Sequence, residues 1–332
     1  MPDYIASLPA CDESFSSWLQ RLPAATLSHA DILQTVSERQ LVGFDGLDTV
    51  DPDFDLPYHF ESRMRESFHL KRFSFEQFRA QALWILPHSF ADYACLSCIG
   101  NSLRKHEKIV FQKNWRYVVA PICPVHCEIL TGFRDRQSGY LQYLLPHTTP
   151  LRMNLPRHAA AEVVKIALKI QIQMLRMEKQ LSAGSSSFIS PLMKIYNARK
   201  LLIEFFLQAA PAGAGLATQF ITTPRPKEPS LRGHGLKLLM KIGALQSNCA
   251  ERACALVLMG VVTGWVTAQQ IKILNEKVRS ERITWGWRPI DIGRSCRQIY
   301  DHHMFSNMTQ IGPALEILNN RHITLFKKGL GI

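Results

Sequence analysis

The sequence predicts a mainly α-helical protein that carries a small zinc-binding module in its first half. Apolar residues recur every three or four positions over long stretches, which indicates amphipathic helices. Cysteine and histidine gather in one short region, and the composition, 46% hydrophobic and 20% charged, is that of a globular protein. The 332 residues suffice for two or three domains. We expect a helix-turn-helix-like module at 1–90, a zinc finger at 91–133, a helical middle region at 134–221 and a linker at 222–235. A C-terminal helical domain is expected at 236–332, with a winged-helix-like arrangement and plain helical packing as its two alternatives.

Three short helices are expected before the cysteine-rich region. The first runs from Phe15 through Trp18 to Leu22, with Asp12 or Ser14 as its N-cap. The second covers 28–40 and the third 74–84, with serine caps at their starts. Three such helices in succession are typical of a helix-turn-helix-like module.

The cysteine-rich region contains two short knuckles with metal-ligand spacing. Cys95 and Cys98 form a C-x2-C pair, and after 24 residues Cys123 and His126 form a C-x2-H pair. Three thiolates and one imidazole complete a tetrahedral zinc shell, and four protein ligands leave no position for an activated water. We therefore predict one structural zinc ion, with Cys127 as an alternative to His126 for the fourth ligand. A short strand is expected from Trp115 into the second knuckle.

The rest of the chain follows a helical pattern. A long amphipathic helix is expected over 158–181, with Lys165, Lys169, Gln173 and Arg176 on its polar side. Another begins at Ser190-Pro191 and ends before Pro211. Beyond the Pro- and Gly-rich linker, helices are expected near 236–246, 248–259 and 267–279.

Charge is distributed unevenly along the chain. Residues 1–61 hold eleven acids and two bases, which is a net charge of −9. Since the whole chain has a net charge of +12, residues 62–332 carry +21. A basic surface of that size favours a nucleic acid or nucleoprotein partner. The candidate contacts are Arg282 and Arg288, which flank two tryptophans, together with Lys165 and Lys169. A solvated basic face remains the alternative for the two lysines.

Enzyme signatures are missing from the sequence. It has no G-x-x-x-x-G-K-[ST] phosphate loop, no G-x-S-x-G and no H-E-x-x-H. The His302-His303 pair reads as a polar helix end. We also expect neither a signal peptide nor a membrane span, and hence a cytoplasmic, nucleoid-associated bacterial protein.

Two segments together resemble the TniQ family of transposon target-selection adaptors. The first, Asp12 to Leu22, is similar to the family's N-terminal D-E-S-x-x-S-W-x-x-R opening. The second is the pair of knuckles, with Trp115 shortly upstream of Cys123. The chain departs from the family at Cys127, where the family has glycine, and in the first knuckle, where the usual proline between Cys95 and Cys98 is missing.

The resemblance implies an adaptor and not an enzyme. Such a protein links a target-recognition element, either DNA itself or an RNA-guided complex such as Cascade, to a TnsC-like AAA+ ATPase; it could act as a homodimer. We expect the acidic N-terminal segment, residues 1–61, to dock on the ATPase through Asp51, Asp53 and Asp55. The alternative is a zinc-containing, sequence-specific DNA-binding regulator unconnected with transposition.

Overall fold

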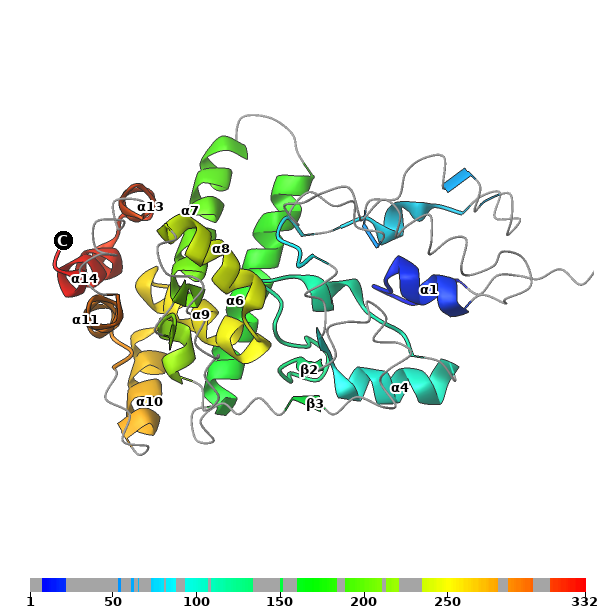
Figure 1. Cartoon of the computed structure of the whole chain (residues 1–332), viewed down its shortest axis with the longest axis horizontal. Helices are drawn as coiled ribbons and strands as arrows, with labels where there is room; N and C mark the ends of the chain where they lie inside the picture. The colour runs from blue at the N-terminus through cyan, green and yellow to red at the C-terminus, as the bar shows by residue number, and fades with distance from the viewer. Residues whose placement is uncertain are drawn as a thin grey trace, which may run out of the picture. The chain divides into compact units, whose positions relative to one another are not determined.

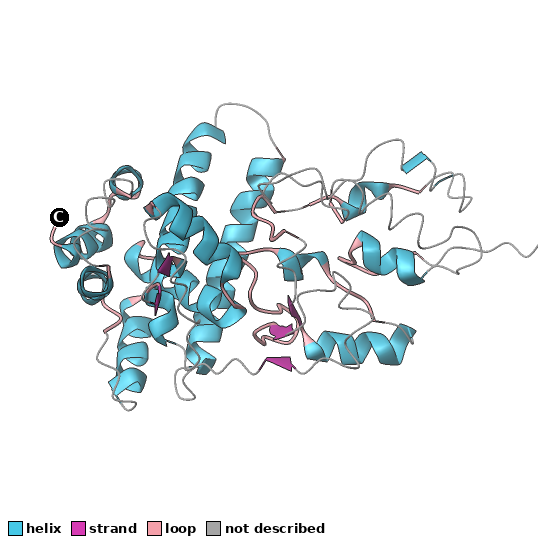
Figure 2. Cartoon of the chain, in the orientation of Figure 1, coloured by secondary structure: helices cyan, strands magenta, loops and turns pink. Residues whose placement is uncertain are grey.

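The computed structural model is mainly helical, with a few very short strands (Figure 2). It describes residues 8–21, 53–54, 61–62, 65, 73–80, 82–87, 93–106, 109–133, 150–151, 160–183, 189–210, 213–220, 235–279, 286–300 and 311–332. The chain divides into two compact units. Unit 1 comprises Met1–Tyr117 and Phe133–Pro150, and unit 2 comprises Val118–Gly132 and Leu151–Ile332.

Unit 1 is built from short elements around an aromatic core. The helices of unit 1 whose bounds are described are α1 (Phe15–Arg21), the 3-10 turns η1 (Phe75–Phe78) and η3 (Lys113–Arg116), and α4 (Leu96–His106). Trp18 is fully buried and stacks on Phe73 with ring centroids 5.0 Å apart, while Phe15 meets Phe78 edge-on at 5.3 Å. Aromatic pairs of this geometry add to the gain from burial alone. The core therefore joins α1 to η1, segments about 60 residues apart in the sequence.

A buried ionic network fixes the start of α1. The Glu13 carboxylate accepts hydrogen bonds from the Ser17 hydroxyl at 2.9 Å and from Arg21 at 2.8 and 2.6 Å. Main-chain bonds then join the segment before α1 to the stretch around η3: Ser14 N to Phe111 O at 2.8 Å, and Lys113 N to Asp12 O at 2.8 Å. The polar residues of the N-terminal motif thus hold the fold of unit 1 together.

Unit 2 is a helical assembly centred on α9 (Cys249–Val262), every residue of which is buried. Asn248 and Glu251 form a reciprocal capping box at its start. The long helices α6 (Ala160–Ser182) and α7 (Ile189–Leu207) pack against α9, as does the 3-10 turn η4 (Leu216–Phe220) (Figure 1). The other helices in the described part of unit 2 are α8 (Leu236–Gln246), α10 (Ala268–Arg279), α11 (Pro289–Ile299), α13 (Gly312–Ile317) and α14 (Arg321–Leu330).

Two contacts fix the end of unit 2. Helices α11 and α14 cross at Gly293 and Gly329, where a Cβ on Gly293 would come within 2.3 Å of the Phe326 carbonyl oxygen. The Tyr300 hydroxyl, just after α11, donates to Phe205 O at 2.9 Å and accepts from Leu216 N at 3.2 Å. One phenol therefore joins the ends of α7 and η4.

The short strands add little. β1 (Tyr93–Ala94), β2 (Thr131–Phe133) and β3 (Pro150–Leu151) form a three-stranded sheet in that order. β4 (Ala209–Ala210) and β5 (Gly213–Ala214) form an antiparallel hairpin in which Ala209 pairs with Ala214. Among the described residues, no helix has both the length and the apolar character needed to cross a bilayer.

Several predicted elements can now be compared with the structure. The long helix over 158–181 and the helices near 236–246, 248–259 and 267–279 are confirmed within a few residues. The helix expected over 74–84 is only the turn η1, although Ser74 does cap it. The strand expected from Trp115 is wrong, because that residue belongs to η3. Helices from both sides of the expected linker pack together in unit 2. The helix at 28–40, His302-His303 and nearly all of the linker lie outside the described residues.

Candidate metal centre

The first knuckle sits at the start of α4. Cys95 immediately precedes the helix, and Cys98 lies in its first turn, so both side chains extend from the same end. The Cys98 backbone N–H points at the Cys95 sulfur, with N to Sγ at 3.4 Å. An N–H group in this position can donate to the sulfur of a metal-bound cysteine. Cys95 and Cys98 are both buried.

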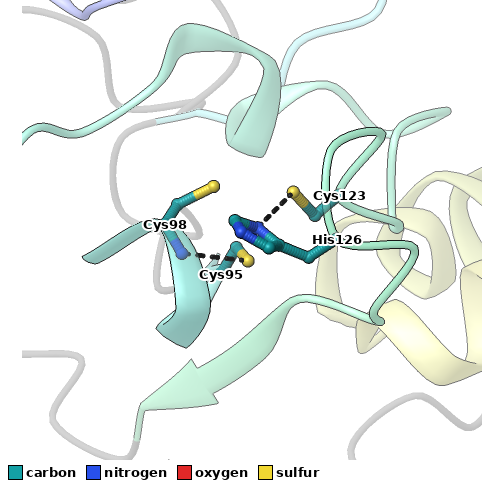
Figure 3. A group of neighbouring side chains, drawn as sticks. All are labelled: Cys95, Cys98, Cys123 and His126. Atoms are coloured by element: carbon teal, nitrogen blue, oxygen red, sulfur yellow. Dashed lines mark hydrogen bonds between the residues drawn. The ribbon is translucent and has the colours of Figure 1, made fainter. Parts of the chain in front are cut away.

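The second knuckle is a tight hairpin. Main-chain bonds run from Cys123 N to Glu128 O at 2.8 Å and from Leu130 N to Pro121 O at 3.0 Å. The turn between them closes with Cys127 N donating to Cys123 O at 2.9 Å. Cys127 has φ of 54°, in the left-handed region that favours glycine. This turn directs the side chains of Cys123 and His126 to the same side (Figure 3).

The four predicted ligands come together. The sulfur atoms of Cys95, Cys98 and Cys123 and a ring nitrogen of His126 all lie within 4.8 Å of one another, and the side chains point toward a common centre (Figure 3). Cys123 Sγ is 3.6 Å from His126 Nδ1. A tetrahedral zinc site with Zn–S bonds of about 2.3 Å places its sulfurs about 3.8 Å apart. The donor set and its spacing therefore fit one zinc ion.

The arrangement assigns the fourth position to the histidine. Cys127 is exposed and does not belong to the four-residue cluster. Its left-handed backbone places it beyond the turn that brings His126 to the other three residues. With four protein donors the shell is closed, so the centre is suited to holding two chain segments together and leaves no coordination position for substrate.

One supporting residue was not foreseen from the sequence. Gln171, buried on α6, donates from Nε2 to Ile122 O at 2.8 Å and accepts from Ile122 N at 3.1 Å. Ile122 is the residue directly before the ligand Cys123. The sequence signal was a polar glutamine within a mostly apolar stretch of the predicted helix. A buried polar group needs a hydrogen-bond partner, but the sequence does not identify Ile122 as that partner.

The remaining candidate residues are scattered. Lys165 and Lys169 are exposed on α6. Arg288 is exposed as the N-cap residue of α11 and forms an ion pair with Asp291, with Nε to Oδ2 at 2.6 Å. Arg282 lies outside the described residues, so its place beside Arg288 stays a prediction.

The acidic candidates differ from the expectation at one position. Asp53 is buried, with 3% of its surface exposed; it accepts from Ser16 N at 2.7 Å and pairs with Arg116 at 3.1 Å. Asp53 was expected on an exposed docking loop, and this is wrong: the carboxylate neutralises a buried guanidinium in unit 1. Asp51 and Asp55 lie outside the described residues.

Comparison with known proteins adds no relative: no family model, no curated protein and no solved structure matches this chain.

Proposed function

We propose that this protein is a target-selection adaptor of DNA transposition. It links a target-recognition element, either DNA or an RNA-guided complex of the Cascade type, to a TnsC-like AAA+ ATPase that recruits the transposase. In this role it performs no chemistry of its own, and its zinc ion is structural. The proposal rests on the resemblance of two segments to the TniQ family, on the burial of Trp18 in the first segment and on the convergence of the four knuckle residues in the second.

The geometry of these two segments supports the proposal. In the segment that resembles the family's opening, Glu13 and Arg21 form a buried pair and Trp18 lies in the core of unit 1. A structural role of this kind explains why a module would keep these residue types at this spacing. In the second segment, the four knuckle residues converge as zinc ligands do.

The residue after the zinc histidine supports the same reading. Cys127 takes the place of the family's glycine, and its φ of 54° is a conformation that glycine adopts without steric cost. The hairpin thus keeps the backbone geometry that the family's glycine would allow, although the residue differs.

A helix-turn-helix element in the second half of unit 2 is part of the proposal. Helices α9 and α10 are joined by a short turn in which Gly264 has φ of 78°. A glycine turn between two helices is typical of such elements. Since α9 is buried, α10 is the helix of this pair that would face nucleic acid.

The experiment is an affinity purification of the tagged full-length chain, with and without nuclease, from cells that also express the neighbouring genes. Recovery of an AAA+ ATPase that survives nuclease treatment supports the adaptor. Recovery of DNA fragments of one sequence, with no ATPase in either arm, would instead support the zinc-containing DNA-binding regulator. The exposed lysines of α6 favour that second candidate as much as the first. Absence of an ATPase and transposase gene nearby would point the same way.

A further inference from the structure

Helix α6 presents a row of four positively charged side chains to solvent. The members of this α6 row are exposed and follow one another at intervals of four, seven and three residues: Lys165, Lys169, Arg176 and Lys179. These intervals place them on one face of the helix. At about 1.5 Å of rise per residue, the row extends for about 21 Å.

The charges of the α6 row are not neutralised within the described part of the chain. None of the four side chains forms an ion pair or hydrogen bond with a described residue, whereas Arg21, Arg116 and Arg288 each have an acidic partner. Of the two acids on α6, Glu178 is fully buried and accepts a short hydrogen bond from the Tyr196 hydroxyl. The other, Glu162, lies in the first turn, where its negative charge interacts favourably with the helix dipole.

The opposite face of α6 is committed to the core of unit 2. The buried residues on that face are Val163, Ile166, Ile170, Met174, Met177 and Leu181. The helix is therefore held in place by packing against α9 and cannot offer an apolar face to a lipid surface. Of the large apolar side chains on α6, only Ile172 is exposed, with 37% of its surface accessible.

We infer that the α6 row binds the phosphate backbone of duplex DNA without regard to its sequence. A protein partner would require an apolar centre in the contact, which this face lacks. Interfaces with DNA are more polar and far more positive, and phosphate contacts from lysine and arginine position a protein on the duplex. The inference extends the two expected lysines to a continuous surface. It rests on the proposed function only in expecting DNA as a partner, and it would hold equally for a regulator.

The test is the salt dependence of binding between the full-length chain and a short random-sequence DNA duplex. The first variant replaces the α6 row with glutamine: K165Q, K169Q, R176Q and K179Q. The control variant removes the same charge from exposed lysines on four other helices, α4, α7, α8 and α14, with K105Q, K194Q, K237Q and K328Q. Each lost phosphate contact should reduce the slope of log affinity against log salt by about 0.9, or by about 3.6 for the whole row.

We expect the slope of log affinity against log salt to fall by most of this amount in the row variant. In the control variant the slope should stay close to the wild-type value. Equal losses in the two variants would overturn the inference, because they would reflect net charge alone. It would also be overturned by an unchanged slope in the row variant, or by a wild-type chain that binds no duplex. Circular dichroism and zinc content verify that both variants are folded. No ATPase is present in this assay, so a failure of the α6 row is distinguishable from a failure to bind the ATPase in the purification experiment.

Discussion

Gln171 and Ile122 are joined by two hydrogen bonds, so that one side-chain amide satisfies both the N–H and the C=O of the residue that precedes Cys123, a member of the candidate metal centre. The side-chain amide bonds to the backbone of Ile122 as a neighbouring strand would, and it fixes the second knuckle to α6. Both partners are buried, so the bonds are protected from competition with water.

We expect Gln171→Ala to weaken the metal centre as well as the fold. The change leaves two buried backbone groups of Ile122 without their partner, which should lower the free energy of unfolding by about 2–4 kcal/mol. Zinc should be lost to a competing chelator about tenfold more readily, as is common for residues that support metal ligands. Urea denaturation and a chelator titration measure the two effects. Gln180→Ala, on the exposed side of the same helix, is the control and should change neither.

One zinc ion per chain is expected by metal analysis of the purified protein. Cys95→Ser and His126→Ala should each lose the metal, because a three-ligand shell binds zinc much more weakly. Cys127→Gly should retain it and unfold at the same or a higher temperature, since glycine relieves a left-handed conformation that costs other residues about 1 kcal/mol. A zinc-free Cys127→Gly protein would show that Cys127, rather than His126, supplies the fourth ligand.

The acidic N-terminal segment, residues 1–61, is tested with two separate variants, because Asp53 is buried whereas Asp51 and Asp55 lie outside the described residues. Asp53→Asn removes the carboxylate charge that pairs with the buried guanidinium of Arg116 and should destabilise unit 1 by about 3 kcal/mol. Thermal unfolding measures this effect, and an unchanged midpoint would contradict the buried pair.

Asp51→Asn with Asp55→Asn should leave the fold intact and slow association with a TnsC-like ATPase at low salt, because long-range attraction acts mainly on the association rate. Interferometry at two salt concentrations measures that rate. If it is unchanged in the double variant, these acids are not the docking surface.

Alkaline pH should destabilise unit 2 through its buried thiols. Burial raises the pKa of Cys249 to about 12, against a smaller opposing effect of nearby Arg252, and burial also raises the pKa values of Cys254 and Cys296. Between the unfolded value near 9 and the folded value, the folded thiol keeps a proton that the unfolded thiol has lost. The free energy of unfolding should therefore fall as pH rises above about 9, by about 1.4 kcal/mol per pH unit for each thiol. Urea titrations from pH 8 upward, at about half-unit steps, test this. In Cys249→Ala the decline should be shallower; an equal slope would contradict the assignment.

The features that the sequence predicted are those whose signal is local. Helix α6 was found because its apolar residues repeat with the helical period, and the four-residue cluster that could hold a metal was found because each knuckle has a fixed short spacing. Neither inference needed knowledge of what the segment packs against.

The features that were missed depend on partners distant in the sequence. Asp53 lies in an acidic stretch and was expected at the surface, yet its partner Arg116 is 63 residues away. The segment from Trp115 has the composition of a strand, but it begins inside the 3-10 turn η3. Its strand-type pairing in the described structure is the isolated antiparallel bridge between Ile85 and Tyr117, to which the bond from Leu86 N to Arg116 O at 2.8 Å belongs. A preference for strand depends on cross-strand neighbours and packing, so composition alone did not decide the outcome.

The Tyr300 phenol has a consequence for how the chain folds. It is the residue that bonds to Phe205 O at the end of α7, 95 positions earlier, and to Leu216 N at the start of η4. At a translation rate of about 5–20 residues per second, a ribosome would need about 5–20 s after making α7 before this partner exists. During that interval the ends of α7 and η4 lack their final contact, and contacts of such long sequence separation form late. The second unit should therefore reach its native state only after synthesis of α11, and it depends on remaining unaggregated until then.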